Sequence, residues 1–135
     1  MTLTLASLLL AAIAAYSPQA APAGGPSIDQ EFSLRIGRTV TITGEKLKIT
    51  FASVAEDSRC PKGVDCIWAG NGRIVLEVRK KSKKPARLSL NTLQAPTEGN
   101  YRQYRIRLVR LDPHPVYGVT PDPAGYEATL VVSKQ

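Results

Sequence analysis

Cys60 and Cys66 are the only cysteines of the chain and its first candidates for chemistry. Pro61 and Gly63 lie between them and favour a turn that folds the chain back on itself. A disulfide needs Cα atoms about 4.4–6.8 Å apart, which a turn of this length supplies. Two other roles for the cysteines fit less well. A structural zinc site usually has about four ligands. A redox-active pair of cysteines is more typically spaced C-x-x-C. We therefore predict a structural disulfide.

The segment 57–71 around these cysteines is the predicted recognition surface. It is longer than the two to five residues of a typical hairpin loop, and rigid loops on β scaffolds concentrate binding residues. A second interpretation stays open, in which Ile67 and Trp68 fold over an end of the domain as a hydrophobic lid, with the Trp68 ring packed on the disulfide. Arg59 has an aspartate on either side in sequence, so an ion pair within the loop is expected. The candidate binding residues are Asp57, Arg59, Lys62, Asp65, Trp68 and Asn71.

The run from Asp57 to Asn71 reads D-S-R-C-P-x-x-x-x-C-x-W-x-G-N. It resembles the signature of a small secreted bacterial β domain that recurs in proteins of uncharacterised function. The similarity extends from about Phe32 to Val132 and includes a later L-x-x-L-x-P-x-P stretch, at Leu108, Leu111, Pro113 and Pro115. The resemblance implies a small β domain outside the cytoplasm. It brings no activity and no catalytic residues with it.

The first 23 residues have the features of a signal peptide. They contain no charged side chain. The apolar run from Leu3 to Tyr16 is shorter than a typical transmembrane helix and has the length of the apolar region of a signal peptide. Ala21-Pro22-Ala23 supplies the small-x-small pattern before a cleavage site. An n-region with Lys or Arg is missing. Export to the periplasm or the extracellular space agrees with paired cysteines. We predict a signal peptide at 1–23, a flexible lead-in at 24–30 and a single soluble β domain at 31–135, without a transmembrane segment after cleavage.

Hydrophobic residues of the predicted domain alternate with a period of two, which indicates strands. Gly44-Glu45 fits a two-residue type II′ turn, which would place Ile42 opposite Leu47 and Val40 opposite Ile49. The same register places Phe51 opposite Arg38 and suggests either a bulge at Gly37 or an arginine stacked on the ring. No window carries a convincing helical stripe outside the leader. We therefore predict an all-β fold, an antiparallel sandwich or small barrel of about six or seven strands with one short-range disulfide loop.

The chain has a formal net charge of +7, which favours anionic partners. Such a partner would be an anionic envelope polymer or a lipid headgroup, and a protein partner stays open. Nucleic acid is not expected, because of the compartment and because no aromatic residues interleave with the basic run as stacking platforms. The predicted basic surface consists of Arg79, Lys80, Lys81, Lys83, Lys84, Arg105 and Arg107.

No catalytic motif is found in the sequence. His114, the only histidine, lies between two prolines, and we expect it to be a solvated loop residue. A calcium site built from Asp57, Asp65 and Asn71 is conceivable but is not predicted, and neither is any cofactor. We predict a secreted, non-catalytic binding or structural domain of unknown ligand. One alternative is a small hydrolase or redox enzyme whose site is assembled only in the fold. Another is a protease inhibitor that presents Lys62 in the disulfide loop.

Overall fold

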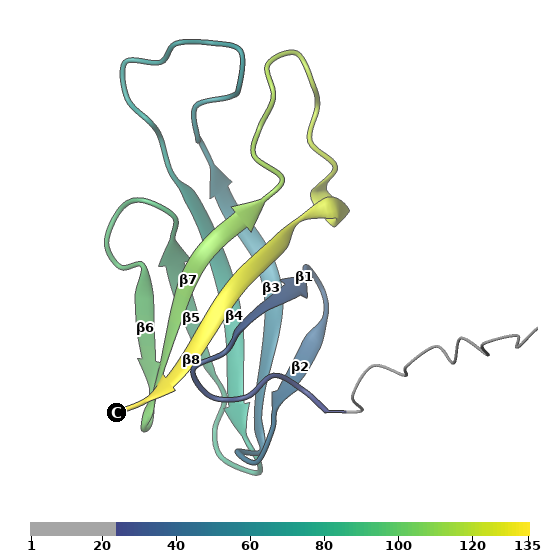
Figure 1. Cartoon of the computed structure of the whole chain (residues 1–135), viewed down its shortest axis with the longest axis vertical. Coiled ribbons are helices and arrows are strands. Elements are labelled where there is room, and N and C mark those ends of the chain that lie inside the picture. The colour runs from purple at the N-terminus through teal and green to yellow at the C-terminus, as the bar shows by residue number, and fades with distance from the viewer. Residues whose placement is uncertain (1–23) are drawn as a thin grey trace, which may run out of the picture.

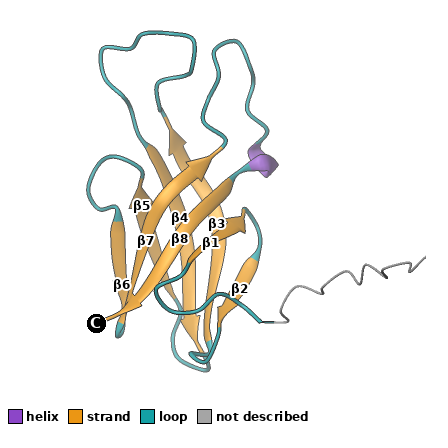
Figure 2. Cartoon of the chain, in the orientation of Figure 1, coloured by secondary structure: helices purple, strands orange, loops and turns teal. Residues whose placement is uncertain are grey.

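The computed structural model describes residues 24–135, and the predicted signal peptide lies outside the described residues. The strands form two antiparallel four-stranded sheets, in the orders β1-β8-β7-β6 and β2-β3-β4-β5 (Figures 1 and 2). The predicted all-β class is confirmed, with eight strands in a sandwich instead of six or seven. A single 3₁₀ turn, Pro123–Gly125, precedes the last strand. The strands are β1 (Glu31–Arg35), β2 (Thr39–Ile42), β3 (Leu47–Asp57), β4 (Gly72–Lys80), β5 (Ala86–Asn91), β6 (Glu98–Tyr101), β7 (Tyr104–Asp112) and β8 (Glu127–Lys134).

The core lies between the two sheets and is built from the alternate residues that face inward. Successive side chains of a strand point to opposite faces, so every second residue of a strand faces the other sheet. These inward positions hold mainly aromatic and branched aliphatic side chains. The buried set is Leu34, Ile42, Leu47, Ile49, Phe51, Ile74, Leu76, Val78, Leu90, Tyr101, Tyr104, Ile106, Leu108, Leu111, Tyr126, Ala128, Leu130 and Val132. Across residues 24–135, no helix has the length and apolar character needed to cross a membrane.

The β2–β3 hairpin has the predicted register, with Ile42 opposite Leu47 and Val40 opposite Ile49. The predicted turn is wrong. Residues 43–46 form the connection, and the turn hydrogen bond runs from Glu45 N to Ile42 O at 3.2 Å, so the glycine with positive φ is third in the turn instead of second.

A bulge precedes β2 at Gly37, which is one of the two alternatives suggested by the predicted register. Gly37 N donates to Phe51 O at 2.7 Å, and Phe51 N donates to Arg38 O at 3.1 Å. Two residues therefore oppose one, which defines a β-bulge. The positive φ of 79° at Gly37 is the conformation that glycine adopts most readily in such bulges.

Other segments also differ from the predicted pattern. β3 has register shifts between Phe51 and Ser53 and between Val54 and Glu56. β7 carries a bulge between Leu108 and Arg110, so that both Leu108 and Leu111 face the core. This shift explains the L-x-x-L spacing. The segment 24–30, predicted as a flexible lead-in, makes hydrogen bonds in the structure: Thr43 N donates to Pro26 O, and Asp29 N donates to Val132 O.

The two ends of the sandwich differ in construction. The tight connections 43–46, 81–85 and 102–103 lie at one end, which we call the turn end. The long connections 58–71, 92–97 and 113–122 lie at the other, which we call the loop end. In Figure 1 the segments 58–71 and 113–122 extend well beyond the strands at the top of the view. The disulfide loop belongs to the loop end, so the candidate site is sought there.

Candidate functional site

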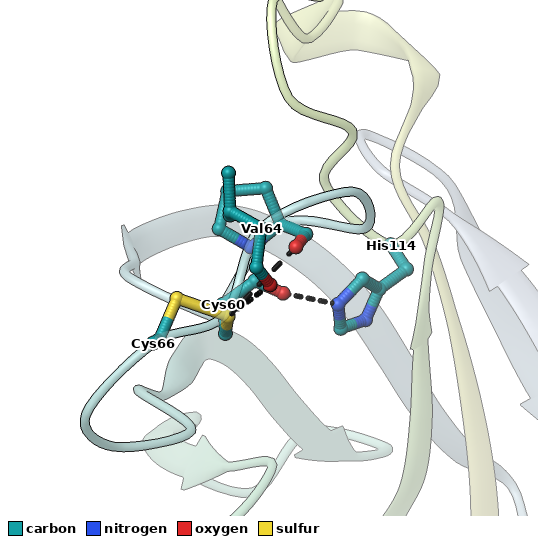
Figure 3. Close-up of a disulfide and its surroundings, with 5 residues drawn as sticks. Cys60, Val64, Cys66 and His114 are labelled. Atoms are coloured by element: carbon teal, nitrogen blue, oxygen red, sulfur yellow. Dashed lines mark hydrogen bonds between the residues drawn. A yellow bond between two sulfur atoms is a disulfide. The ribbon is translucent and has the colours of Figure 1, made fainter.

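The disulfide loop begins as an irregular continuation of β3 and β4. Ser58 N donates to Asn71 O at 2.8 Å, and Cys60 N donates to Ala69 O at 2.8 Å. Beyond these bonds a disulfide joins Cys60 to Cys66, with 5.9 Å between their Cα atoms. The predicted disulfide is therefore confirmed (Figure 3).

The segment 113–122 lies against the disulfide loop. Lys62 N donates to Pro115 O at 2.9 Å, and Lys62 O accepts from Tyr117 N at 3.0 Å. The ring of His114 points at the same loop, with Nε2 2.7 Å from Cys60 O (Figure 3). The predicted solvated histidine is thus exposed but also bonded to the disulfide loop. Both backbone groups of Lys62 are engaged within the chain, which leaves only its exposed side chain for a partner.

Arg59 joins the disulfide loop to the end of β7. Its Nε and one terminal nitrogen donate to the two carboxylate oxygens of Asp57, at 2.7 and 2.9 Å. Its other N–H groups reach two backbone carbonyls, Leu111 O at 2.6 Å and Pro113 O at 2.8 Å. The guanidinium presents donors in a rigid fork, which suits this kind of multiple bridging. The side chain is only 8% exposed, so Arg59 is a structural residue.

Asn71 fixes the third segment, 92–97, in the same way. Its amide nitrogen donates to Asn91 Oδ1 at 2.8 Å. Its amide oxygen accepts from the backbone N of Leu93 and Gln94, at 3.3 and 3.4 Å. The neighbouring Gly72 exchanges two further bonds with Thr92. All three long segments are therefore cross-braced into one rigid unit.

The carboxylate of Asp57 is held in its charged form by this arrangement. Burial alone raises the pKa of Asp57, but hydrogen bonds from Arg59 and Tyr126 outweigh it and lower that pKa below its usual value. Burial, together with the hydrogen bond to the Asp57 carboxylate, raises the pKa of Tyr126. The group Asp57, Arg59 and Tyr126 is thus a satisfied ionic cluster beneath the loops.

The six candidate loop residues separate into two groups. Arg59 and Asn71 are buried, and Asp57 is 11% exposed on its side chain, so these three hold the loop together. Lys62, Asp65 and Trp68 are exposed and available to a partner. Sequence reasoning expected the Asp57–Arg59 pair, but it missed that the arginine also binds two carbonyls more than fifty residues away. Asn71 was predicted to be a binding residue, but it is buried, and no local sequence pattern predicts that burial.

Of the two interpretations left open for this loop, the hydrophobic lid is wrong. Trp68 is 74% exposed and Ile67 is fully exposed, so neither side chain covers the core. The physical reason is that the backbone bonds at Ser58 and Cys60 carry the ribbon outward, beyond the ends of the sheets. The core is closed below it by the buried side chains of Arg59 and Leu111.

Large hydrophobic side chains are exposed on all three segments of the loop end. Among residues 24–135, seven of the eight exposed large hydrophobics lie on these segments, and the eighth, Val109, lies near the end of β7. Single exposed hydrophobics are normal, but a gathering of them at one place marks an interaction site. The apolar set is Val64, Ile67, Trp68, Leu93, Val116, Tyr117 and Val119.

A hollow of about 440 Å³ opens at the loop end between the disulfide loop and β7. Its polar lining is largely engaged within the chain. Arg59 is bonded as above, Arg110 pairs with Asp112 at 2.6 Å, and Thr92 accepts from Gly72. Within residues 24–135, no three His, Cys, Asp or Glu side chains converge on a point that could hold a metal ion. The conceivable calcium set is not assembled, because Asp57 binds Arg59 and Asn71 binds Asn91.

The predicted basic surface is not one surface. Lys80 turns toward Tyr104, with Nζ 2.6 Å from its hydroxyl and 4.9 Å from the centre of its ring. Arg105 and Arg107 lie on β7, in the other sheet from the basic tip between β4 and β5. Arg79, Lys81, Lys83 and Lys84 remain together, exposed at the turn end.

Comparisons of the chain with protein-family models, with curated proteins and with solved structures find no significant match. The resemblance of the segment 57–71 to a secreted bacterial β domain therefore stays a prediction.

Proposed function

We propose that this chain is an exported, non-catalytic binding domain that recognises a protein partner through the loop end. The observation that carries the proposal is the set of large apolar side chains exposed on segments that the chain holds rigid. Leaving such surface in water forgoes about 25 cal/mol per Å² of burial. The bracing by Arg59 and Asn71 lowers the conformational entropy that a partner would otherwise have to remove.

The composition of the loop end favours a protein partner. Trp68 and Tyr117 are 74% and 69% exposed, and these residue types are enriched at the centres of protein interfaces. Charges of both signs surround them, as in the Arg110–Asp112 pair and in the exposed Lys62 and Asp65, so the surface has no strong net sign there. An apolar centre with a polar rim is the usual anatomy of a protein–protein interface.

Binding is favoured over catalysis by the state of the polar groups in the hollow. A catalytic site needs convergent groups that can act on a substrate. Here the guanidinium of Arg59, the hydroxyl of Thr92 and the ring of His114 are each bonded to other parts of the chain. Export is supported by the apolar leader and by the disulfide, which persists in oxidising compartments.

Site-directed photo-crosslinking in the producing organism tests this proposal. A benzophenone amino acid is placed at position 68 or 117 at the loop end, or at position 103 at the turn end as the control. We expect one protein adduct common to positions 68 and 117 and none at 103. The adduct at 117 should disappear when Trp68→Ala is added, whereas the melting temperature should stay unchanged because Trp68 is exposed.

Two results would contradict the proposal. One is the absence of an adduct at both loop positions while the domain is folded and exported. The other is an adduct at position 103 of the same mass and yield, which would show contact without a preferred surface.

A further inference from the structure

Four cations gather on the outer face of the β2-β3-β4-β5 sheet at the turn end. Lys48 on β3 lies directly opposite Arg79 on β4, and Thr41 on β2 lies opposite Lys48 on its other side. Lys46 and Lys81 continue the cluster at the adjoining turns, where Lys81 N donates to Lys46 O at 3.3 Å. All five side chains belong to exposed residues.

The charge pairing of this cluster is unlike that of the rest of the face. Where two other charged residues face each other across strands of this sheet, their charges are opposite. Glu56 lies opposite Arg73 and Glu77 lies opposite Arg87, with closest charged atoms 3.8 and 3.9 Å apart. Like charges directly opposite each other destabilise an antiparallel pair.

No acid in the described chain forms an ion pair with the cluster. None of the four cations of the cluster makes an ion pair with any residue of 24–135, and the preceding segment 1–23 contains no Asp or Glu. Glu77 lies beside the cluster on the same face, but its carboxylate pairs with Arg87 at 3.9 Å. The cluster therefore keeps four cations that are unpaired within the described residues, at a structural cost.

The cluster surrounds a hollow of about 240 Å³, lined by Thr41, Lys46, Lys48, Arg79 and Lys81. Its wall is mostly apolar, so the aliphatic stems of these four cationic residues form more of it than their charged ends do. Of the four non-glycine residues with positive φ in the described chain, two are Lys46 and Lys81, at 54° and 48°. Such conformations are sparsely populated by non-glycine residues and often accompany binding sites.

We propose that this cluster of cations binds a phosphate or sulfate group carried on an extended anionic polymer. The guanidinium of Arg79 can bind two oxygens of such a group, and the lysines supply point charges around it. Lys83 and Lys84 lie exposed on the neighbouring connection 81–85, where they meet the next anionic groups along the polymer. A membrane surface is less well matched, because interfacial binding combines charge with buried apolar area. The exposed large hydrophobics of the described chain lie near the loop end instead.

The test compares two double variants with the same change of charge. Lys48→Gln with Arg79→Gln removes the centre of the cluster. Arg35→Gln with Arg107→Gln is the control, because these arginines are exposed on strands of the other sheet and make no ion pair with residues 24–135. Affinity for heparin and for a polyphosphate chain is measured by titration at two salt concentrations. Inorganic phosphate and phosphatidylglycerol vesicles serve as further probes.

We expect the first variant to lose about tenfold or more in affinity for at least one polymer, because each hydrogen bond to a charged group contributes about that factor. The control should lose about twofold or less, as expected for exposed charges screened by salt. The first variant should also melt at the same or a higher temperature than the wild type, since it removes a like-charge pair. If it fails to fold, Lys46→Gln with Lys81→Gln replaces it under the same expectations.

Equal losses in the two variants would overturn the proposal, because net charge alone would then explain binding. Binding of vesicles but of neither polymer would overturn it in favour of a lipid headgroup. If inorganic phosphate bound as tightly as the polymers, the proposed polymer ligand would be wrong, and the ligand would be a single free anion. None of these outcomes depends on the loop end.

Discussion

Arg59 holds Asp57 by two parallel hydrogen bonds of 2.7 and 2.9 Å, and the same guanidinium binds the backbone of a strand in the opposite sheet. One buried side chain therefore connects β3 and the disulfide loop to the end of β7. Because the loop end is tied to both sheets, the exposed Trp68 and Tyr117 project from a fixed base.

Replacing Arg59 by lysine should destabilise the domain. Lysine keeps the charge but cannot bridge a carboxylate and two carbonyls from one planar group. We expect the free energy of unfolding to fall by about 2–4 kcal/mol, the range for breaking a buried charged network. Denaturant unfolding followed by circular dichroism of the β-sheets measures it.

The matched control for that variant is Arg110→Lys. Arg110 pairs with Asp112 at the same two-residue spacing and at 2.6 Å, but its side chain is 64% exposed. We expect a change within about 0.5 kcal/mol, as for surface pairs. Equal effects of the two substitutions would show that burial of the Arg59 cluster contributes nothing.

The Asp57 cluster should make stability depend on acid pH. The pKa of Asp57 is lower in the folded chain than in the unfolded one, where it is about 3.9. Its contribution is therefore fully present above that unfolded value and is lost as pH falls through the folded pKa. The gap in melting temperature between the wild type and Asp57→Asn should be constant near neutral pH and narrow below about pH 4. A gap that widens in acid would contradict this sign.

The disulfide should contribute modestly to stability. It closes a short loop, for which the chain-entropy model gives about 2 kcal/mol. We expect Cys60→Ser with Cys66→Ser to fold, because the ribbon bond from Cys60 N to Ala69 O does not need sulfur. Its free energy of unfolding should be lower by that amount. Intact mass after alkylation, with and without reductant, checks the bond itself, and two reactive thiols in native exported protein would refute it.

Gly70 should tolerate no side chain. Its φ is +69°, and a Cβ atom there would lie 1.8 Å from Ser58 O. Gly63 is the matched control, since its φ is +95° but the nearest atom to an added Cβ is 3.8 Å away. Gly63→Ala should cost about 1–2 kcal/mol for the left-handed backbone, and Gly70→Ala considerably more. Similar melting temperatures for both variants would show that the ribbon from Ser58 to Asn71 opens without cost.

The predicted parts of the fold depend on neighbours in sequence. Ile42 and Leu47 are five residues apart, so alternation and a glycine between them were enough to pair them, although the predicted turn type was wrong. The partners of Arg59 at Leu111 and Pro113 are 52 and 54 residues away, and no local pattern encodes them. β6 was missed because Glu98–Tyr101 contains no hydrophobic alternation. The lid interpretation failed for Trp68 because nothing in the sequence says how far the ribbon projects beyond the core.

The cross-bracing of the loop end divides it into a constant framework and replaceable tips. Arg59, Asn71 and Gly70 anchor the segments near the sheets, whereas the exposed positions 64–65, 67–68 and 119–121 take no part in that anchoring. Mutations at those tips should accumulate without loss of folding, so specificity can drift while the scaffold persists. The same division makes the domain suitable for display libraries in which only the tips are randomised.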